Sequence, residues 1–298
     1  MDDGEWLAQR FEQQRPRLRA VAYRMLGSLT DADDAVQDVW LRLSQSEAGQ
    51  IENLAGWLTT VVARECLHVL RSRRHRREDT VGLGVPDPIV VPDGDADPEQ
   101  EVLLADSVGL ALLVVLNYLS PAERLAFVLH DMFDLPFEEI APLIERSPGA
   151  ARQLASRARR RVQGAEVPPP GPDLQRHRQV VDAFFAAGRA GDFAALVNLL
   201  DPDVVLRADF GGGRPPAVFR GVSAVAKLAR EPLGAQVHPV LVNGTVGRVI
   251  TIGGRPHSVL AFTIADGKIV EIDAIGEPER VSRIAATVLT GRRIHRSK

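Results

Sequence analysis

Cysteine is almost absent from the sequence, and Cys66 is its only instance among 298 residues. An internal disulfide and a zinc site built from several thiolates are therefore excluded. Long apolar runs are absent as well: the longest, residues 108–116, is far shorter than the roughly 20 residues that cross a bilayer as a helix. The first residues, Met1–Asp3, lack the basic and apolar regions of a signal peptide. We therefore expect a cytoplasmic protein without a membrane anchor, a metal ion or a cofactor.

Basic residues are absent from a long internal stretch that begins at Glu78 and ends at Glu123. Acids and prolines accumulate in its first part, so residues 78–104 are predicted to form an acidic, extended linker. A second proline-rich segment, residues 166–173, predicts a short and stiff connection. With 45% hydrophobic residues the chain can fill several cores. The two segments divide it into predicted domains at 1–77, 105–165 and 174–285, followed by a basic tail at 286–298.

The first predicted domain is helical, because apolar residues recur at helical spacing. Gly27-Ser28 interrupts this pattern, and Thr30 with Asp33 three residues later predicts the cap of a second helix. The face opposite the apolar residues of that helix carries Asp31, Asp34 and Asp38. Two interpretations remain open for this acidic stripe: a solvated outer face, as on many surface helices, or a docking surface for a basic partner.

A third helix is predicted from Asn53 to Arg74, and Glu65 is an exception in its apolar face that the pattern does not explain. The neighbouring face carries Arg64, His68 and Arg71. Such a basic ridge can neutralise phosphates and so bind DNA, most strongly at low salt. Basic helix ends also complement the helix dipole, so the ridge alone does not distinguish the two interpretations.

The second predicted domain contains three short helices, whose starts are indicated by Ser120-Pro121, Pro136 and Ser147-Pro148. The last two have the length and spacing of a helix-turn-helix, in which the second helix enters the DNA major groove. Helical spacing directs alanines of that helix inward and places polar residues outside: Gln153, Ser156 and Arg160, flanked by Arg152 and Arg157. Arg and Gln make bidentate contacts with guanine and adenine, and Arg159 and Arg161 are better placed for phosphates. An amphipathic helix of a plain bundle is the alternative interpretation.

Two segments resemble domains of one known family. Domain 2 of an extracytoplasmic-function (ECF) sigma factor is similar to residues 11–77, which include RPRLRAVAYRMLGSLTDADDAVQDVWLRL and GWLTTVVARECLHVLRSRRHRRE. Domain 4 of the same family is similar to residues 105–163, which include YLSPAERLAFVLHDMFDLPFEEIAPLIERSPGAARQLASRARRRV. The segments follow one another in the family's order. The resemblance implies two all-α domains and a factor that directs core RNA polymerase to promoters, while the chemistry belongs to the polymerase.

The resemblance also implies roles for single residues. The helix DADDAVQDVW would dock on the clamp helices of the polymerase β′ subunit through Asp31, Asp34, Gln37 and Asp38. The third helix would meet the −10 promoter element, and residues 50–57 would hold a base flipped out of the stack. The implied −10 contacts are Trp57, Arg64, His68, Arg71, Arg73 and Arg74. Domain 4 would bind the polymerase β flap and would contact the −35 element through Arg152, Gln153, Ser156, Arg157, Arg159 and Arg160.

The third predicted domain alternates helices and strands. Its pattern predicts helices at 174–188, 193–200 and 222–230, and strands at 204–210, 246–252, 258–264 and 268–274. Asp266-Gly267 would join the last two strands as a hairpin turn. The order indicates an α+β domain with a curved antiparallel sheet. It resembles the cone-shaped SnoaL-like domain that is fused behind the sigma domains of the SigJ-like group.

Two short motifs of that group have counterparts here, Asp209-Phe210-Gly211-Gly212-Gly213-Arg214 and Glu277-Pro278-Glu279-Arg280. Both depart from the group's pattern, the first by the inserted Phe210 and the second by the loss of an asparagine. The glycine run nevertheless indicates a loop in which two backbones approach closely. The regulatory residues that the resemblance implies are Asp209, Gly211, Gly212, Gly213, Arg214, Pro278 and Arg280.

Three functions remain open at this point. The resemblance implies a sigma factor, not an enzyme, whose fused domain controls it in cis, with a small-molecule ligand able to shift a compact form toward an open one. The second function is a helix-turn-helix regulator with a ligand-sensing domain, and the third is an enzyme on a DNA-binding carrier. Candidates for catalysis are Asp209, His238, His257 and Asp273, and spacing pairs none of them. Because the net charge is −3, we expect tight promoter binding only together with the polymerase.

Overall fold

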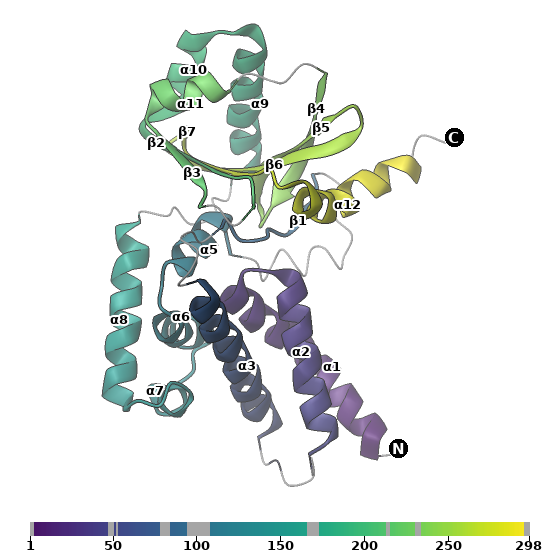
Figure 1. Cartoon of the computed structure of the whole chain (residues 1–298), viewed down its shortest axis with the longest axis vertical. Helices are drawn as coiled ribbons and strands as arrows, with labels where there is room; N and C mark the ends of the chain where they lie inside the picture. The colour runs from purple at the N-terminus through teal and green to yellow at the C-terminus, as the bar shows by residue number, and fades with distance from the viewer. Residues whose placement is uncertain are drawn as a thin grey trace. The chain divides into compact units, whose positions relative to one another are not determined.

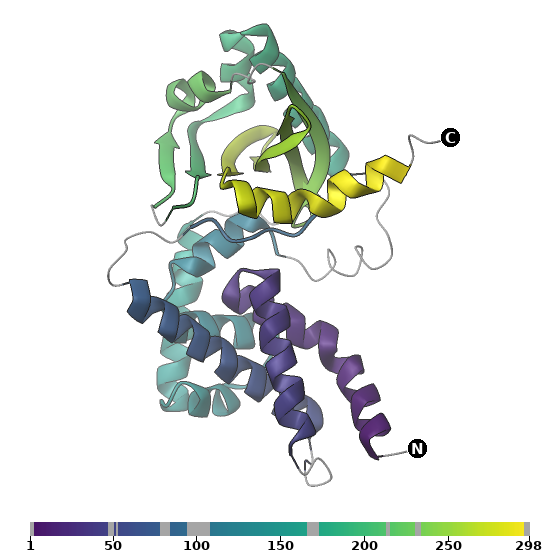
Figure 2. The same ribbon diagram turned by 45° about the vertical axis from the view of Figure 1, so that its right-hand side comes forward.

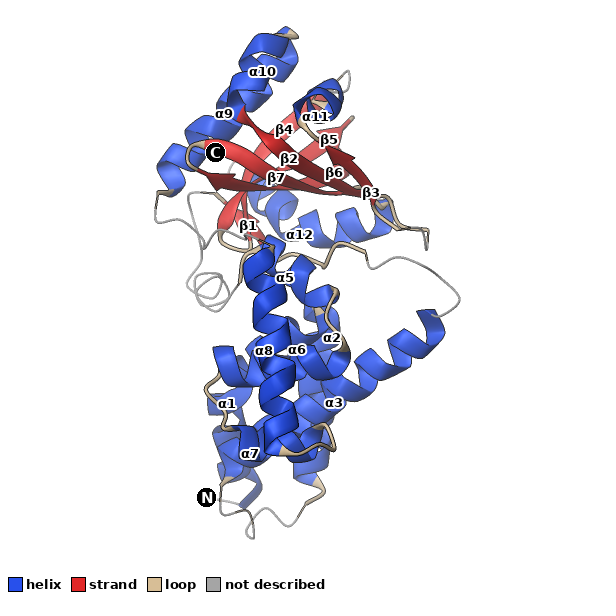
Figure 3. Cartoon of the chain, turned by 90° about the vertical axis from the view of Figure 1, so that its left-hand side faces the viewer, coloured by secondary structure: helices blue, strands red, loops and turns tan. Residues whose placement is uncertain are grey.

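The computed structural model describes residues 3–46, 51, 53–77, 84–93, 108–165, 173–212, 215–229 and 234–294 (Figure 1). Its contacts fall into two compact units. The first combines Met1–Asp79 with Val115–Glu166, and the second combines Thr80–Val114 with Val167–Lys298. Figure 3 shows helices in the first unit, and every strand that it draws belongs to the second. The domain boundaries predicted from the sequence stay predictions, but the segment predicted as a linker groups with the C-terminal part of the chain.

The N-terminal part of the first unit consists of α1 (Asp3–Leu26), α2 (Leu29–Ser44) and α3 (Leu54–Arg77), and α1 contacts both of the others. The chain leaves α1 through Gly27, whose φ of 70° suits a residue without Cβ. Ser28 then adopts an extended conformation and its hydroxyl accepts a hydrogen bond from Asp31 N at 3.4 Å. The prediction of Thr30 as the cap is therefore wrong, because the turn at Gly27 starts the helix earlier and Thr30 lies inside it.

The remainder of the first unit is built from short helices. After α5 (Leu110–Asn117), which the pattern did not predict and of which only the end belongs to this unit, come α6 (Pro121–Phe127), a π turn (Val128–Met132), α7 (Phe137–Ile140), a 3₁₀ turn η3 (Ala141–Leu143) and α8 (Pro148–Gly164). The predicted starts are confirmed: the Ser120 and Ser147 side chains cap α6 and α8, and Glu123 completes a capping box with Ser120. The turn before α8 passes through Glu145, which has a φ of 55°. The helix-turn-helix arrangement is thus present.

The second unit holds one seven-stranded sheet in the order β1-β4-β5-β6-β7-β2-β3. The strands are β1 (Val90–Pro92), β2 (Leu200–Asp209), β3 (Ala217–Arg220), β4 (Ala235–Val242), β5 (Thr245–Ile252), β6 (Arg255–Ala265) and β7 (Lys268–Ile275). Figure 2 shows the predicted curvature of the sheet. Neighbouring strands pair antiparallel, as predicted, except for β2 and β7, which run parallel. The turn at Asp266-Gly267 joins β6 and β7, as expected, with φ values of 51° and 78°.

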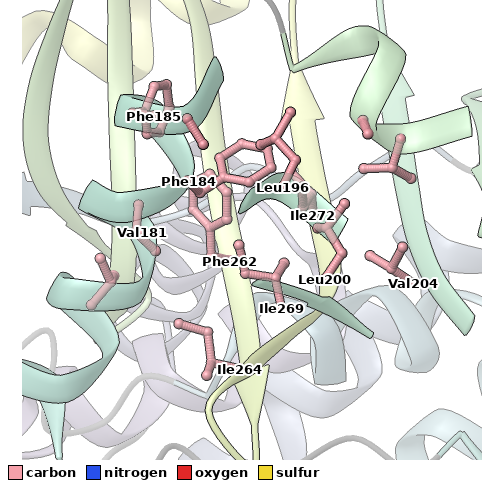
Figure 4. Packing of buried hydrophobic residues seen from close by; sticks show 14 of the residues in the cluster. Val181, Phe184, Phe185, Leu196, Leu200, Val204, Phe262, Ile264, Ile269 and Ile272 are labelled. Carbon is pink, nitrogen blue, oxygen red and sulfur yellow. The ribbon is translucent and has the colours of Figure 1, made fainter. Parts of the chain in front are cut away.

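Helices cover both faces of the sheet. The predicted helices are present as α9 (Leu174–Ala190), α10 (Phe193–Leu199) and α11 (Val222–Leu228). They pack on one face, where Phe184, Phe185 and Phe262 meet at ring-centroid distances of 5.8–6.0 Å in a buried apolar cluster (Figure 4). The other face contacts α12 (Pro278–Ile294), which the pattern did not predict. The helices on each face of the sheet bury the apolar side chains of that face and their own apolar side chains away from water.

No described helix combines the length and the apolar character that a membrane crossing requires. Among the same residues, no group of three or more His, Cys, Asp or Glu side chains is arranged to hold a metal ion.

Candidate functional site

The acidic face of α2 is exposed. Asp34, Gln37 and Asp38 are open to solvent and form no hydrogen bond or ion pair with another described residue, whereas Ala35, Val36 and Val39 are buried on the opposite side. Asp31 differs from the other three, because it is half-buried and pairs with Arg73 of α3 at 2.6 Å. One residue of this face was missed from the sequence. Leu41 follows Asp34, Gln37 and Asp38 at helical spacing and its side chain remains 48% exposed, which is unusual for a leucine.

Glu65, the charged residue in the apolar face of α3, has a partner on α2. The Glu65 carboxylate accepts a hydrogen bond from Arg42 of α2, so the two helices are joined by an ion pair beside their apolar contact. Glu65 is half-buried, and burying its carboxylate without such a partner would be costly. Glu65 therefore has a structural role.

The basic face of α3 contains three exposed side chains, Arg64, His68 and Arg71. Arg73 is half-buried, because besides its ion pair with Asp31 it donates to the carbonyl oxygen of Leu26 at 3.3 Å. Trp57 is half-buried near the start of α3, where the Asn53 side chain accepts a hydrogen bond from Gly56 N. Part of the predicted base-holding loop, including Gln50, lies outside the described residues, as does the side chain of Arg74.

The exposed side of α8 is a stripe with few internal partners. Gln153, Ser156, Arg157 and Arg160 follow one another at helical spacing and form no hydrogen bond with another described residue, opposite the buried Ala151, Ala155 and Ala158. The flanking arginines are engaged: Arg152 lies over the Phe137 ring at 5.2 Å. Arg159 donates two hydrogen bonds to Asp131, at 2.9 and 2.6 Å, and this raises the pKa of its guanidinium. The four stripe residues are therefore the ones available for an external partner.

The two sets of helices in the first unit are packed against each other. Arg124 of α6 is buried beside α1 and α3, where it donates to the Arg24 carbonyl oxygen at 2.9 Å and to Asn117 Oδ1 at 2.6 Å. Burial lowers its pKa to about 9, so it stays charged at neutral pH, and its Nη2 atom has no partner among the described residues. Burial also raises the pKa of the nearby Cys66 thiol to about 12, which keeps it protonated and unreactive.

The described part of the predicted linker, residues 84–93, is bound to the sheet of the second unit. Strand β1 pairs antiparallel with β4 from Val90↔Val242 to Pro92↔Val240, and Val85, Ile89, Val90 and Val91 are buried. Ion pairs hold this segment on both sides of the strand. Arg178 of α9 donates two hydrogen bonds to Asp93, at 2.8 and 2.5 Å, and Arg283 of α12 donates one to Asp87 at 2.7 Å.

The two sequence motifs meet at the start of that segment. Asp209 is 3% exposed, and its Oδ2 accepts hydrogen bonds from Val85 N at 2.9 Å and from Arg280 Nη1 at 2.8 Å. Arg280 also donates to Asp87 and to the Val85 carbonyl oxygen. A Cβ atom at Gly84 would lie 2.6 Å from Asp209 Oδ2, so a larger residue there would displace this carboxylate from its hydrogen bonds.

The other motif residues surround this contact. Gly211 N donates to Asp209 Oδ1 at 3.0 Å with a φ of 70°, and a Cβ there would collide with the side chain of Glu277. Gly212 and Pro278 are exposed and contribute no side-chain contact to the linker. Phe210 is exposed beside Gly276. Gly213 and Arg214 lie outside the described residues.

The four candidates for catalysis have separate partners. Asp209 binds the linker as described, and His238 is hydrogen-bonded to Thr251 Oγ1 at 2.9 Å. Asp273 is buried, which raises its pKa although Arg207 donates to it at 2.9 Å. His257 is exposed. The three engaged side chains have structural partners, and no pairing of nucleophile with base is formed among the four.

Comparisons with known proteins agree on one family. The family models described as sigma-70 region 2 and sigma-70 region 4 match residues 10–76 and 109–162. The chain is 39% identical over 288 residues to the ECF RNA polymerase sigma factor SigJ of Mycobacterium tuberculosis, which covers 91% of each chain. It is 35% identical to a probable ECF RNA polymerase sigma factor, SigI, of the same species, over 91% of this chain and 93% of that one. The crystal structure of M. tuberculosis SigJ superposes with a TM-score of 0.70 at 35% identity, over 92% of this chain and 97% of SigJ.

Proposed function

The chain belongs to the ECF RNA polymerase sigma factors, and on that premise we propose which of its surfaces bind core polymerase, which bind promoter DNA and which part of the chain controls this binding. As a member of this family it binds core RNA polymerase and directs initiation at promoters, and its second unit has the SnoaL-like fold. The family acts through binding and not through catalysis of its own. The assignment of surfaces and the control by the second unit are our proposals.

Core polymerase binds the exposed face of α2. Asp34, Gln37 and Asp38 offer negative charge and hydrogen-bond acceptors that no described residue occupies, and Leu41 adds an apolar centre to the same stripe. Interfaces of this kind place an apolar contact among polar ones, so that the charges orient the partner and the buried side chain adds affinity. The implied partner is the basic surface of the β′ clamp helices. Asp31 would contribute less, because it is already paired with Arg73.

Promoter DNA binds two basic faces of the first unit. The stripe of α8 presents Gln153, Ser156, Arg157 and Arg160 to the major groove of the −35 element. Arg64, His68 and Arg71 of α3 follow the −10 element. Arg73 has a structural partner, so its contact with DNA would require the loss of an ion pair.

The compact first unit is a resting form. Arg71 of the −10 face lies 4.0 Å from Glu145 in the turn before α8, so the two DNA-binding faces are close together. The −35 and −10 elements are by name 25 base pairs apart, which is about 85 Å of B-form DNA. The two faces therefore cannot bind their elements at the same time until α6 separates from α3. That interface contains the incompletely paired Arg124, which would regain hydration on opening and so lowers the cost of separation.

The second unit restrains this opening by holding the linker. The linker joins the two DNA-binding domains, and the observation that carries the proposal is the binding of residues 84–93 as an added strand with ion pairs at Asp87 and Asp93. A linker held in this way cannot extend to let the domains separate. Core polymerase, or a ligand with higher affinity for the open form, would shift the equilibrium.

The docking face is tested by charge reversal. Replacing Asp34→Lys and Asp38→Lys should abolish binding to purified core polymerase, measured by co-migration in gel filtration, because like charges would then meet across the interface. The same reversals at Glu5 and Asp203, two exposed acids on other elements, serve as the control and should bind normally. Equal binding by both double variants would contradict the assignment of α2.

The control by the second unit is tested by transcription in vitro. The full chain is compared with a chain ending at Asp173, using core polymerase and selected promoter fragments. We expect the shortened chain to initiate more transcripts, because its linker has lost the strand β4 on which it was bound. Fewer transcripts from the shortened chain would instead make the second unit an activator. If neither form binds core, the helix-turn-helix regulator becomes the better explanation.

A further inference from the structure

Asn243 occupies the turn between β4 and β5. The turn geometry explains why an asparagine is found there but not why its side chain is buried. The turn Asn243-Gly244 has φ values of 50° and 77°, as a two-residue hairpin requires. Asparagine is common at such a position because it tolerates positive φ, and the turn geometry does not require its side chain to be buried. Here the residue is 1% exposed, so its amide group must have partners inside the protein.

Those partners come from two backbone positions, one within the linker and one just after it. The Asn243 backbone N donates to the Ile89 carbonyl oxygen at 2.8 Å, and the Asn243 Oδ1 atom accepts from Ile89 N at 2.7 Å. Its Nδ2 atom donates to the Val108 carbonyl oxygen at 2.8 Å. Ile89 lies before strand β1 and Val108 lies before α5, so a single side chain bonds to two backbone positions that flank the rest of the linker.

The second hairpin of the sheet shows that the turn itself does not need this side chain. Asp266-Gly267 between β6 and β7 has φ values of 51° and 78°, nearly those of Asn243-Gly244. Asp266 is exposed, and it makes no hydrogen bond to the described part of the linker. The same backbone geometry therefore exists with and without linker contacts, and the burial of Asn243 reflects the linker and not the turn.

An asparagine is suited to this position for a chemical reason. Its amide is both a donor and an acceptor, so it can satisfy a buried N–H and a buried carbonyl at once, and it recognises backbone whatever the neighbouring side chains are. When a strand is added to a sheet edge, backbone N–H groups pair with backbone carbonyl groups. Here the Asn243 side chain extends this pairing by one residue beyond Val90↔Val242, to Ile89. If the amide is lost, the buried N–H of Ile89 is left without an acceptor.

We propose that Asn243 is a positioning residue that fixes two positions to the β4–β5 turn, Ile89 within the linker and Val108 just after it, so that both are held and released together. This deepens the control in cis proposed above and rests on it only for its consequence in transcription. The contact itself lies within the folded chain and does not depend on the polymerase. Release at Ile89 and release at Val108 become one event, because the same side chain bonds to both.

Three variants of the full chain test the proposal by hydrogen–deuterium exchange with mass spectrometry. Asn243→Gly keeps a residue that tolerates positive φ but removes both side-chain bonds, and Asp266→Gly makes the matched change in the other hairpin. We expect peptides covering 84–93 and 108–113 to exchange at least about tenfold faster in Asn243→Gly, with β6–β7 peptides unchanged. Asp266→Gly should leave both linker peptides as in the natural chain.

Asn243→Asp distinguishes positioning from simple stability. Its carboxylate can still accept from Ile89 N, but an oxygen replaces the donor that faces the Val108 carbonyl. We expect faster exchange at 108–113 and retained protection at 84–93. Linker exchange in Asn243→Gly within threefold of Asp266→Gly would overturn the proposal, as would equal loosening of all peptides by Asn243→Asp. Faster linker exchange with unchanged transcription would support the role of Asn243 and would count against control in cis.

Discussion

Neutralising Asp87 should release the linker from the second unit without altering that unit itself. Asp87 lies on the linker, and Arg280 Nε and Arg283 Nη2 both donate to its carboxylate. In Asp87→Asn the charge is lost, one oxygen remains as an acceptor, and the new NH₂ group faces a guanidinium. The change therefore removes a charge-assisted bond and adds a repulsive donor–donor contact.

The size of the effect follows from the exposure of the two arginines. The Arg280 side chain is 16% exposed, and a hydrogen bond to a charged group in such a setting contributes about 1.5–3 kcal/mol. The Arg283 side chain is 58% exposed, and pairs of that kind contribute about 0–1 kcal/mol. Because asparagine keeps one acceptor, we expect a loss of about 2 kcal/mol, which corresponds to a roughly 30-fold larger equilibrium constant for release of the linker.

Hydrogen–deuterium exchange of the full chain measures this equilibrium directly. The Val85 and Ile89 amides donate to Asp209 and Asn243, so their exchange reports release of the segment. Glu279→Gln is the matched control, because it removes one negative charge from an exposed side chain next to Arg280 that does not touch the linker. Exchange at 84–93 should rise about 30-fold in Asp87→Asn and stay unchanged in the control. A rise below threefold, or an equal rise in both variants, would show that the ion pairs do not hold the linker.

Three further predictions concern other parts of the molecule. Replacing Arg157→Ala and Arg160→Ala should weaken holoenzyme binding to −35 DNA and reduce its preference for the matched −35 sequence over a scrambled one by about 1–3 kcal/mol for each lost base contact, measured by competitive titration; an unchanged preference would place both residues away from the base edges. Burial alone would raise the pKa of Glu123, but hydrogen bonds from the Ser120 hydroxyl and backbone N–H, together with the charge of Arg161, outweigh burial and hold this pKa below its usual range. The stabilisation by the Glu123 carboxylate is therefore present at neutral pH and is lost as the pH falls below about 4.5. Glu123→Ala should therefore destabilise the helical unit by about 1–2 kcal/mol at pH 7 in denaturant titrations, and the difference from the natural chain should shrink at pH 4; a difference independent of pH would contradict the capping role. Phe184→Ala removes a ring from the centre of the apolar cluster and should cost about 3–5 kcal/mol, visible as a lower melting temperature of the second unit, whereas the same substitution at the exposed Phe193 should cost far less.

Local patterns predicted the elements whose reasons are local. The starts of α6 and α8 follow from a serine placed before a proline, and their geometry needs no distant residue. The buried faces of α2 and α8 follow from apolar residues at helical spacing, which is why the exposed acidic and basic faces opposite them were predicted as well. The misplaced cap at Thr30 shows the limit: two hydroxyl residues are close in sequence, and the turn at Gly27 decides between them.

Elements without a local signal were missed. Strand β4 contains Pro239, which usually argues against a strand, and it is accommodated because Pro239 lies just beyond the residues that pair with β1. Strand β1 has only three residues among prolines and acids, so its pattern indicates a loop. It becomes a strand because β4 offers an edge to which it can bond. The role of Glu65 could not be predicted either, since its partner Arg42 lies on another helix.

Residues close together in the chain were enough to predict the family, most of the helices and the faces that these helices expose, although α5 and α12 were missed. The contacts of the linker, in contrast, depend on the folded structure. Its acids looked like solvated charges, but Asp87 meets Arg280 across 193 positions of the sequence, and Ile89 meets Asn243 across 154. A pattern of neighbouring residues contains no information on such a contact. Its free energy arises when folding brings the two groups together in a site from which water is excluded.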